Sequence, residues 1–292
     1  EDYFRKAVTT LTERNPNPIN GEPLFNLGLA QVFQGKDEEA YASFHKSVWN
    51  AAWVDSGYFE LARLNAKSGN WKDALDEVGR SLSRNVHHHK ARQLKASILR
   101  KLDRKEEAEQ WVESSLARDM FNFSMYYERA LLNPGTSSAK EDLAVMKKLM
   151  RGNIHNYIEF ALDYCFAGLY DEAVEFIRIG IEEQKEQPVY PMAYYYQAWF
   201  QAMMGAREEA RQSLRLAAQA SPDYCFPHQN ESVVVLEWAK QENPEDAKAP
   251  YYLGNLWYNA KNYEEAISNW ELSESLDDTF SIVHRNLALA YF

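Results

Sequence analysis

The sequence predicts an all-α fold in which antiparallel helix pairs stack into a solenoid. In residues 249–270, apolar side chains form two short amphipathic runs joined by a polar turn at residues 259–262, which is the pattern of two antiparallel helices. Small residues also recur at a fixed step, because Ala40, Ala74 and Ala108 stand 34 residues apart. One helix pair cannot bury its apolar face alone, so this period indicates an array of stacked pairs.

Other positions keep the same step and define the expected helix contacts. They are Gly28, Ala62 and Ala96 on the first helix, Phe44, Val78 and Val112 on the second helix, and Gly35 and Gly69 in the turn. A small residue on the first helix lets the second helix approach closely, whereas a larger side chain at Ala74 would overpack the crossing. Glycine in the turn can take a positive φ at the helix C-terminus.

The repeat pattern divides the chain into segments, which we expect to form a single domain over residues 1–292. The segments are a terminal helix of a preceding repeat (1–20), three regular repeats (21–122), a degenerate repeat (123–153), two repeats (154–224), an irregular spacer with one helix at 231–240 (225–246), and a last repeat with a half-repeat (247–292). In the degenerate repeat, Ser138 and Glu141 fit a capping box for the second helix. The sequence lacks an initial Met and ends within the pattern, so we expect a fragment that associates end to end through its open termini.

Composition and charge restrict the classes of partner. The formal net charge of −11 disfavours nucleic acid and anionic membrane surfaces, which need a positive footprint. No run approaches the roughly eighteen apolar residues that a spanning helix requires. Two cysteines, Cys165 and Cys225, cannot form a disulfide framework or a spaced-pair metal site. We therefore predict no metal and no cofactor, and leave the compartment open with the cytoplasm favoured.

The repeat unit resembles the tetratricopeptide repeat. The residues that carry the resemblance in the last repeat are Leu253, Gly254, Trp257, Tyr263, Ala266 and Trp270. The resemblance implies a right-handed superhelix of about seven repeats whose concave groove binds a peptide or a partner protein. The pattern of a carboxylate-clamping groove is not matched, because Tyr251 stands where that pattern has a lysine.

A narrower resemblance concerns four short stretches. GEPLFNLGLA (21–30), WNAAW (49–53), YCFP (224–227) and APYYLGNLWY (249–258) are similar to the helical C-terminal half of a family of large bacterial proteins of unknown function. The N-terminal half of that family is β-rich. This resemblance implies that any chemistry, on carbohydrate for example, belongs to the missing half, and that this half is one possible partner.

The tetratricopeptide resemblance implies a ligand-binding groove at first-helix positions. The predicted groove residues are the basic Arg63, Lys67, Arg100 and Lys101, and the largely aromatic Phe166, Tyr195, Trp199, Tyr251, Asn255 and Tyr258. A basic helix face is more often simply solvated, and an aromatic stripe at helical spacing more often packs against the neighbouring repeat. Arg92 and Lys95 occupy positions that normally face the core, which suggests a rotated register in the third repeat.

Candidate catalytic groups are weak. His87, His88 and His89 are adjacent and cannot converge on one metal as helix-spaced pairs can. Cys225, near Asp223 and His228, could suggest a thiol nucleophile, but no oxyanion hole or orienting partner is recognisable. We therefore predict a non-enzymatic scaffold that binds a protein or peptide. The alternative is an accessory domain of a bacterial carbohydrate-active protein that contributes to glycan binding through Trp199 and Tyr258.

Overall fold

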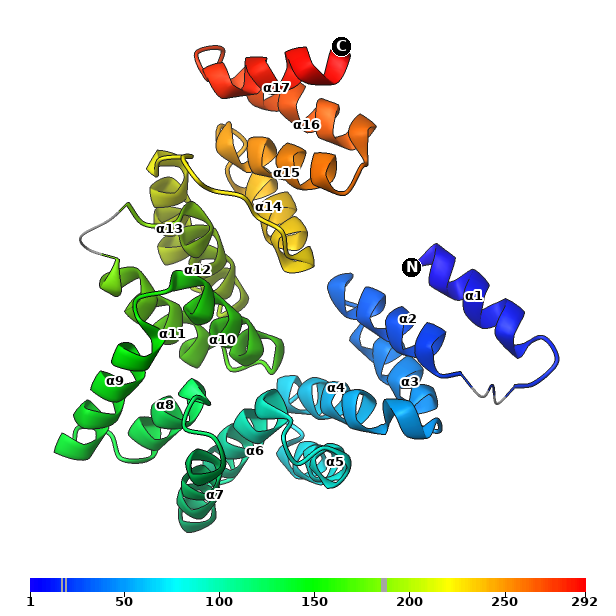
Figure 1. The fold of residues 1–292 in the computed structure, drawn as a ribbon, viewed down its shortest axis with the longest axis vertical. Helices are drawn as coiled ribbons and strands as arrows, with labels where there is room; N and C mark the ends of the chain where they lie inside the picture. The colour runs from blue at the N-terminus through cyan, green and yellow to red at the C-terminus, as the bar shows by residue number, and fades with distance from the viewer. Residues whose placement is uncertain (17, 19, 185–187) are drawn as a thin grey trace. The chain divides into compact units, whose positions relative to one another are not determined.

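The computed structural model describes residues 1–16, 18, 20–184 and 188–292, and within them the fold is entirely helical (Figure 1). The α-helices in chain order are α1 (Asp2–Thr12), α2 (Glu22–Phe33), α3 (Asp37–Ser47), α4 (Val54–Lys67), α5 (Trp71–Arg84), α6 (His89–Lys101), α7 (Lys105–Arg118), α8 (Phe123–Leu132), α9 (Ser137–Met150), α10 (Ile154–Phe166), α11 (Tyr170–Glu183), α12 (Pro191–Met203), α13 (Arg207–Gln219), α14 (Asn230–Glu242), α15 (Lys248–Asn259), α16 (Tyr263–Leu276) and α17 (Ser281–Tyr291). A short 3-10 helix, Ala51–Trp53, precedes α4. The prediction of an all-α repeat solenoid is confirmed.

The helices group into two compact units, where the sequence alone suggested one domain. Unit 1 comprises Glu1–Gly152 and Leu162–Leu169, and unit 2 comprises Asn153–Ala161 and Tyr170–Phe292. Unit 1 contains the pairs from α2 to α9, and unit 2 contains the pairs α12 with α13 and α15 with α16. The spacer helix α14 packs against α12 and α15. Residues 17, 19 and 185–187, which fall in the predicted segments 1–20 and 154–224, lie outside the described residues.

Size complementarity governs how close the two helices of a pair approach. Gly28 faces Phe44, and a Cβ atom added to Gly28 would lie 2.6 Å from the Phe44 ring. In the next pair, at the same spacing, Ala62 and Val78 are both fully buried. A large residue on the second helix is therefore matched by glycine on the first, and a medium one by alanine, as close packing requires.

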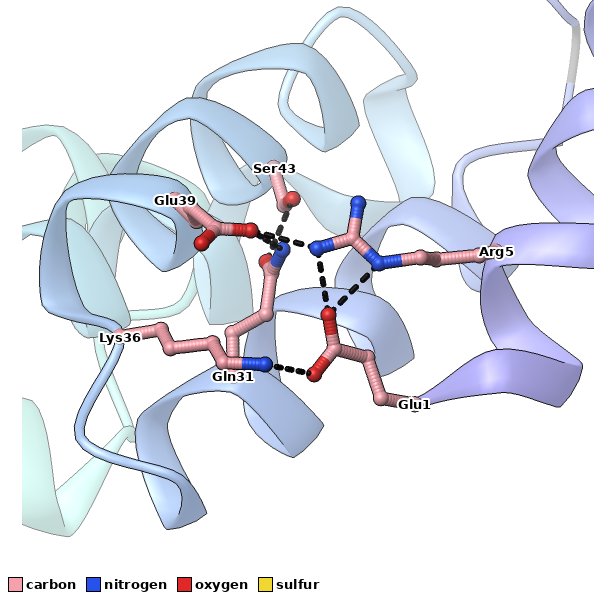
Figure 2. Close-up of polar contacts among 6 residues, drawn as sticks. All are labelled: Glu1, Arg5, Gln31, Lys36, Glu39 and Ser43. Carbon is pink, nitrogen blue, oxygen red and sulfur yellow. Dashed lines mark hydrogen bonds and ion pairs between the residues drawn. The ribbon is translucent and has the colours of Figure 1, made fainter.

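Polar bonds also link the helices of a pair at a constant separation of twelve residues. Gln31 accepts from the Ser43 hydroxyl (2.7 Å), and Asn65 donates to Glu77 (2.8 Å). Figure 2 shows that the first of these bonds continues into an ion-paired network in which Arg5 of α1 contacts Glu39 of α3. No residue of α1 is buried, so α1 is held on α2 and α3 partly by exposed charges, which contribute little each.

Two local predictions were wrong, and each has a physical reason. The N-cap of α9 is Thr136, whose hydroxyl accepts from the Ala139 amide (3.1 Å), so Ser138 lies inside the helix instead of capping it. The third repeat keeps its register, because Arg92 is buried and bonded: it donates to Ser115 (2.8 Å) and its guanidinium stacks 4.1 Å from the Trp111 ring centroid. Burial lowers the pKa of Arg92.

Candidate binding surface

The predicted basic residues of α4 are paired within the chain. Arg63 lies 3.0 Å from the Glu60 carboxylate, and its guanidinium lies over the Phe166 ring at 4.7 Å from the centroid. Lys67 forms an ion pair with Asp37 at 2.6 Å. Burial raises the pKa of Glu60, while the Arg63 charge acts in the opposite direction. Arg63, Lys67 and Phe166 are therefore brought together, as the sequence indicates, and the contacts between them are part of the packing of unit 1.

Glu128 of α8 organises the second basic position. This fully buried carboxylate accepts from Arg100 Nε (2.8 Å), Ser97 Oγ (2.6 Å) and the Tyr164 hydroxyl (2.9 Å). A buried carboxylate is tolerated when charged and neutral donors satisfy its oxygens. Burial and the Glu128 charge raise the pKa of Tyr164 well above its usual value. Lys101, one residue beyond Arg100, is exposed.

The segment Leu162–Leu169 supplies most of these partners. In addition to Tyr164 and Phe166, its Asp163 carboxylate pairs with Lys90 Nζ at 2.8 Å. Gly168 has φ +74° and approaches α4 so closely that an added Cβ would lie 2.7 Å from the Lys67 Cα. Within unit 1, the chain's own segment thus covers first-helix positions that the sequence analysis assigned to a ligand.

Two aromatic residues of the predicted strip belong to the core of unit 2. Tyr195 is fully buried and donates its hydroxyl to Asp246 at 2.6 Å. Tyr251 is also buried, and its ring packs 4.8 Å from that of Phe280. These rings have no open face for a ligand, so they act in packing, which is the reading that the sequence already favoured. Trp199 is half-buried, with its ring 5.8 Å from that of Phe200.

Asn255 and Tyr258 of α15 are the predicted residues of the last repeat that remain accessible. Asn255 Oδ1 accepts from Trp270 Nε1 (3.2 Å) and from Asn286 Nδ2 (3.1 Å), which fixes the amide. The Tyr258 side chain is 41% exposed, and its ring packs 5.3 Å from that of Trp270 and 5.1 Å from that of Tyr263. The two residues therefore form a fixed polar and aromatic surface next to each other on one helix.

The cysteine and histidine candidates do not form a reactive group. The Cys225 side chain is fully buried, and burial raises its pKa to about 12, so the thiol is un-ionised and weakly nucleophilic at neutral pH. His228 is exposed and lies against the Phe226 carbonyl. His88 bonds Asp55 at 2.7 Å. Among the described residues, no three His, Cys, Asp or Glu side chains are arranged to hold a metal ion.

The comparisons with known proteins agree with this architecture. Residues 59–123, from within α4 to the start of α8, match the family model of the tetratricopeptide repeat. The chain contains tetratricopeptide repeats. The repeat residues continue beyond that segment, since Gly254, Ala266 and Trp270 of α15 and α16 are all buried. Among the described residues, no helix has the length and apolar character needed to cross a membrane.

Solved structures of other tetratricopeptide-repeat proteins are similar to this chain. One from Parabacteroides merdae is 18% identical, covers 98% of this chain and 91% of its own, and has a TM-score of 0.34. YrrB, a tetratricopeptide-repeat protein with an unusual peptide-binding site, is 16% identical over 80% of this chain and 98% of its own, with a TM-score of 0.36. Yeast Tom70 is 14% identical over 99% of this chain and 58% of its own, with a TM-score of 0.45. At this level of similarity, the assignment of the repeats depends on the helix pairs and their spacing in the chain itself.

Proposed function

We propose that this chain is a non-catalytic scaffold that binds a protein or peptide segment through first-helix positions of its C-terminal repeats. The observation that carries the proposal is a difference in exposure between the two sets of predicted groove residues. In unit 1, Arg63, Arg100 and Phe166 are engaged by the chain itself. In unit 2, Tyr258 presents an aromatic ring that is 41% exposed.

The Tyr258 region has the properties expected of a binding surface. Its ring is held by Trp270 and Tyr263, and the neighbouring Asn255 amide is fixed by two hydrogen bonds. Side chains that are already fixed lose little conformational entropy when a ligand arrives. Tyrosine is also one of the residues enriched among energetically dominant interface contacts. Trp199 and Lys101, which retain some exposure, are secondary candidates.

A random-peptide library displayed on phage tests this proposal. Peptides enriched on the wild-type chain are synthesised with a fluorophore, and their affinity is measured by anisotropy for the wild type, Tyr258→Ala and Tyr263→Ala. Tyr263 lies on α16, is 51% exposed and makes the same ring contact, so both variants lose that contact. We expect Tyr258→Ala to weaken binding about tenfold or more, as for a dominant interface residue, and Tyr263→Ala to leave it nearly unchanged.

Two results would contradict the proposal. One is the absence of any enriched peptide, and the other is an equal loss of affinity in the two variants. A glycan array, run in parallel, separates the carbohydrate alternative. Sugar binding that is lost in Trp199→Ala, without peptide binding, would replace the peptide ligand by a glycan.

A further inference from the structure

The connection between α13 and α14 displays two large aromatic side chains to solvent. In residues 221–229, Cys225 and Pro227 point into the protein and are buried, whereas Tyr224 is 90% exposed and Phe226 is 65% exposed. Exposed aromatic side chains of this size, gathered in one place, are typical of interaction sites. Burial of the alternating residues explains how the loop is attached but leaves Tyr224 and Phe226 with no structural role of their own.

The loop is held at both ends and in its middle. Lys248 Nζ donates to the Ala220 carbonyl (2.6 Å), the Cys225 amide donates to the Pro222 carbonyl (3.3 Å), and the Tyr196 hydroxyl donates to Gln229 (3.2 Å). Tyr224 adopts φ +58°, a left-handed conformation that is unfavourable for a residue with a bulky side chain. Such conformations persist where the surroundings fix them, and they cluster at functional sites.

The charge of the chain is concentrated in the unit that carries this loop. By sequence, unit 1 has 23 Lys and Arg against 22 Asp and Glu, whereas unit 2 has 9 against 21. Carboxylates also stand at the loop itself: Asp223 lies within it, Glu231 follows it in the first turn of α14, and Glu159 accepts from Gln229. Lys248, which contacts the start of the loop, is already bonded to a carbonyl.

We infer that residues 221–229 form a docking surface for a cationic segment of a partner protein. Lysine or arginine side chains stack favourably on exposed aromatic faces, and the surrounding carboxylates complement their charge. The excess of acidic residues in unit 2 also attracts such a segment over a longer range and repels polyanions. This inference rests on the proposed scaffold function and adds the chemical class of the partner.

The same peptide selection tests the inference, with a different pair of variants. Enriched peptides are sequenced, and their affinities are measured for Tyr224→Ser/Phe226→Ser and for the matched control Met120→Ser/Phe121→Ser. Met120 and Phe121 are neighbours in a loop of unit 1 and are 52% and 60% exposed, so the control removes a comparable exposed apolar pair where acidic and basic residues are balanced. Circular dichroism melting of both variants checks that the fold is retained.

We expect the enriched peptides to carry a net positive charge. We also expect the loop variant to bind them at least about tenfold more weakly than the control variant, as for aromatic residues at the centre of an interface. Peptides without an excess of Lys and Arg, or equal affinities for the two variants, would overturn the inference. If those peptides still depend on Tyr258, the scaffold function survives alone; if no peptide is enriched, both proposals fail.

Discussion

At the scale of single residues, the pairing of glycine with a large aromatic residue determines how closely the helices approach. An alanine at position 28 would place its Cβ 2.6 Å from the Phe44 ring, so we expect Gly28→Ala to destabilise the protein by about 1–3 kcal/mol through overpacking. The double variant Gly28→Ala/Phe44→Val recreates the pair that the protein itself uses at Ala62 and Val78. We expect the double variant to be more stable than the sum of the single changes allows, by about 1 kcal/mol or more. Urea unfolding of the four proteins measures this coupling, and strictly additive losses would contradict the size-matching argument.

The buried carboxylate of Glu60 makes a second residue-scale prediction, on pH dependence. Burial raises its pKa above the ordinary value of 4.5, so the folded protein binds a proton that the unfolded chain has released. Stability contributed by this group is therefore lost as pH rises and regained as pH falls towards 4.5. We expect the stability of the wild type to rise relative to Glu60→Gln between pH 7 and about 4.5. Chemical denaturation of both proteins at several pH values checks this, and parallel pH curves would show that Glu60 is ionised equally in the folded and unfolded states.

At the scale of elements, the contact between Glu128 and Tyr164 attaches the segment Leu162–Leu169 to α6 and α8. The Tyr164 hydroxyl donates to this fully buried carboxylate at 2.9 Å. We expect Tyr164→Phe to cost about 1.5–3 kcal/mol, as for a hydrogen bond to a charged group. In the control Tyr58→Phe, the lost partner is the exposed Arg80, and we expect a cost below about 0.5 kcal/mol.

Hydrogen exchange gives the Tyr164→Phe variant a second measurement. Loss of the attachment should lower the protection of amides in residues 162–169 more than that of α2 and α3, because opening is local when a local contact is removed. A uniform loss of protection throughout unit 1 would show that Tyr164 contributes to global stability and not to the attachment of this segment.

The elements also show which parts of the fold can be predicted from the sequence. Ala40, Ala74 and Ala108 are fully buried, because a helix crossing imposes a size limit that recurs with each repeat. The capping of α9 by Thr136 was missed, since Ser138 and Thr136 both suit an N-cap and only the positive φ of Gly135 decides which one precedes the helix. The burial of Arg92 was also missed, because its partners are on the following helix.

The candidate surface was predictable only in part for a related reason. A period of 34 residues places Arg63, Arg100 and Tyr251 at equivalent helix positions, but it does not say what lies opposite them. Arg63 and Arg100 meet Phe166 and Glu128, and these contacts are non-local. Tyr224 and Phe226 lie outside the repeat pattern altogether, although the alternation of buried and exposed residues in 224–227 and the acidic composition of the C-terminal half were readable signals.

At the scale of the whole chain, the concentration of negative charge in unit 2 predicts how fast a cationic partner associates. Long-range attraction acts over a Debye length of about 10 Å at 0.1 M salt and is largely screened at 1 M. We expect the association rate constant of an enriched cationic peptide, measured by stopped-flow anisotropy, to fall about tenfold or more between low and high salt, with a smaller change in dissociation. Local carboxylates are separated from total charge by Asp223→Asn/Glu231→Gln and by Glu38→Gln/Glu106→Gln, which alter the net charge equally. The first pair adjoins residues 221–229 and should slow association more than the second, whose carboxylates lie in unit 1. Equal slowing by the two pairs would mean that total charge, and not the carboxylates beside Tyr224 and Phe226, guides the partner.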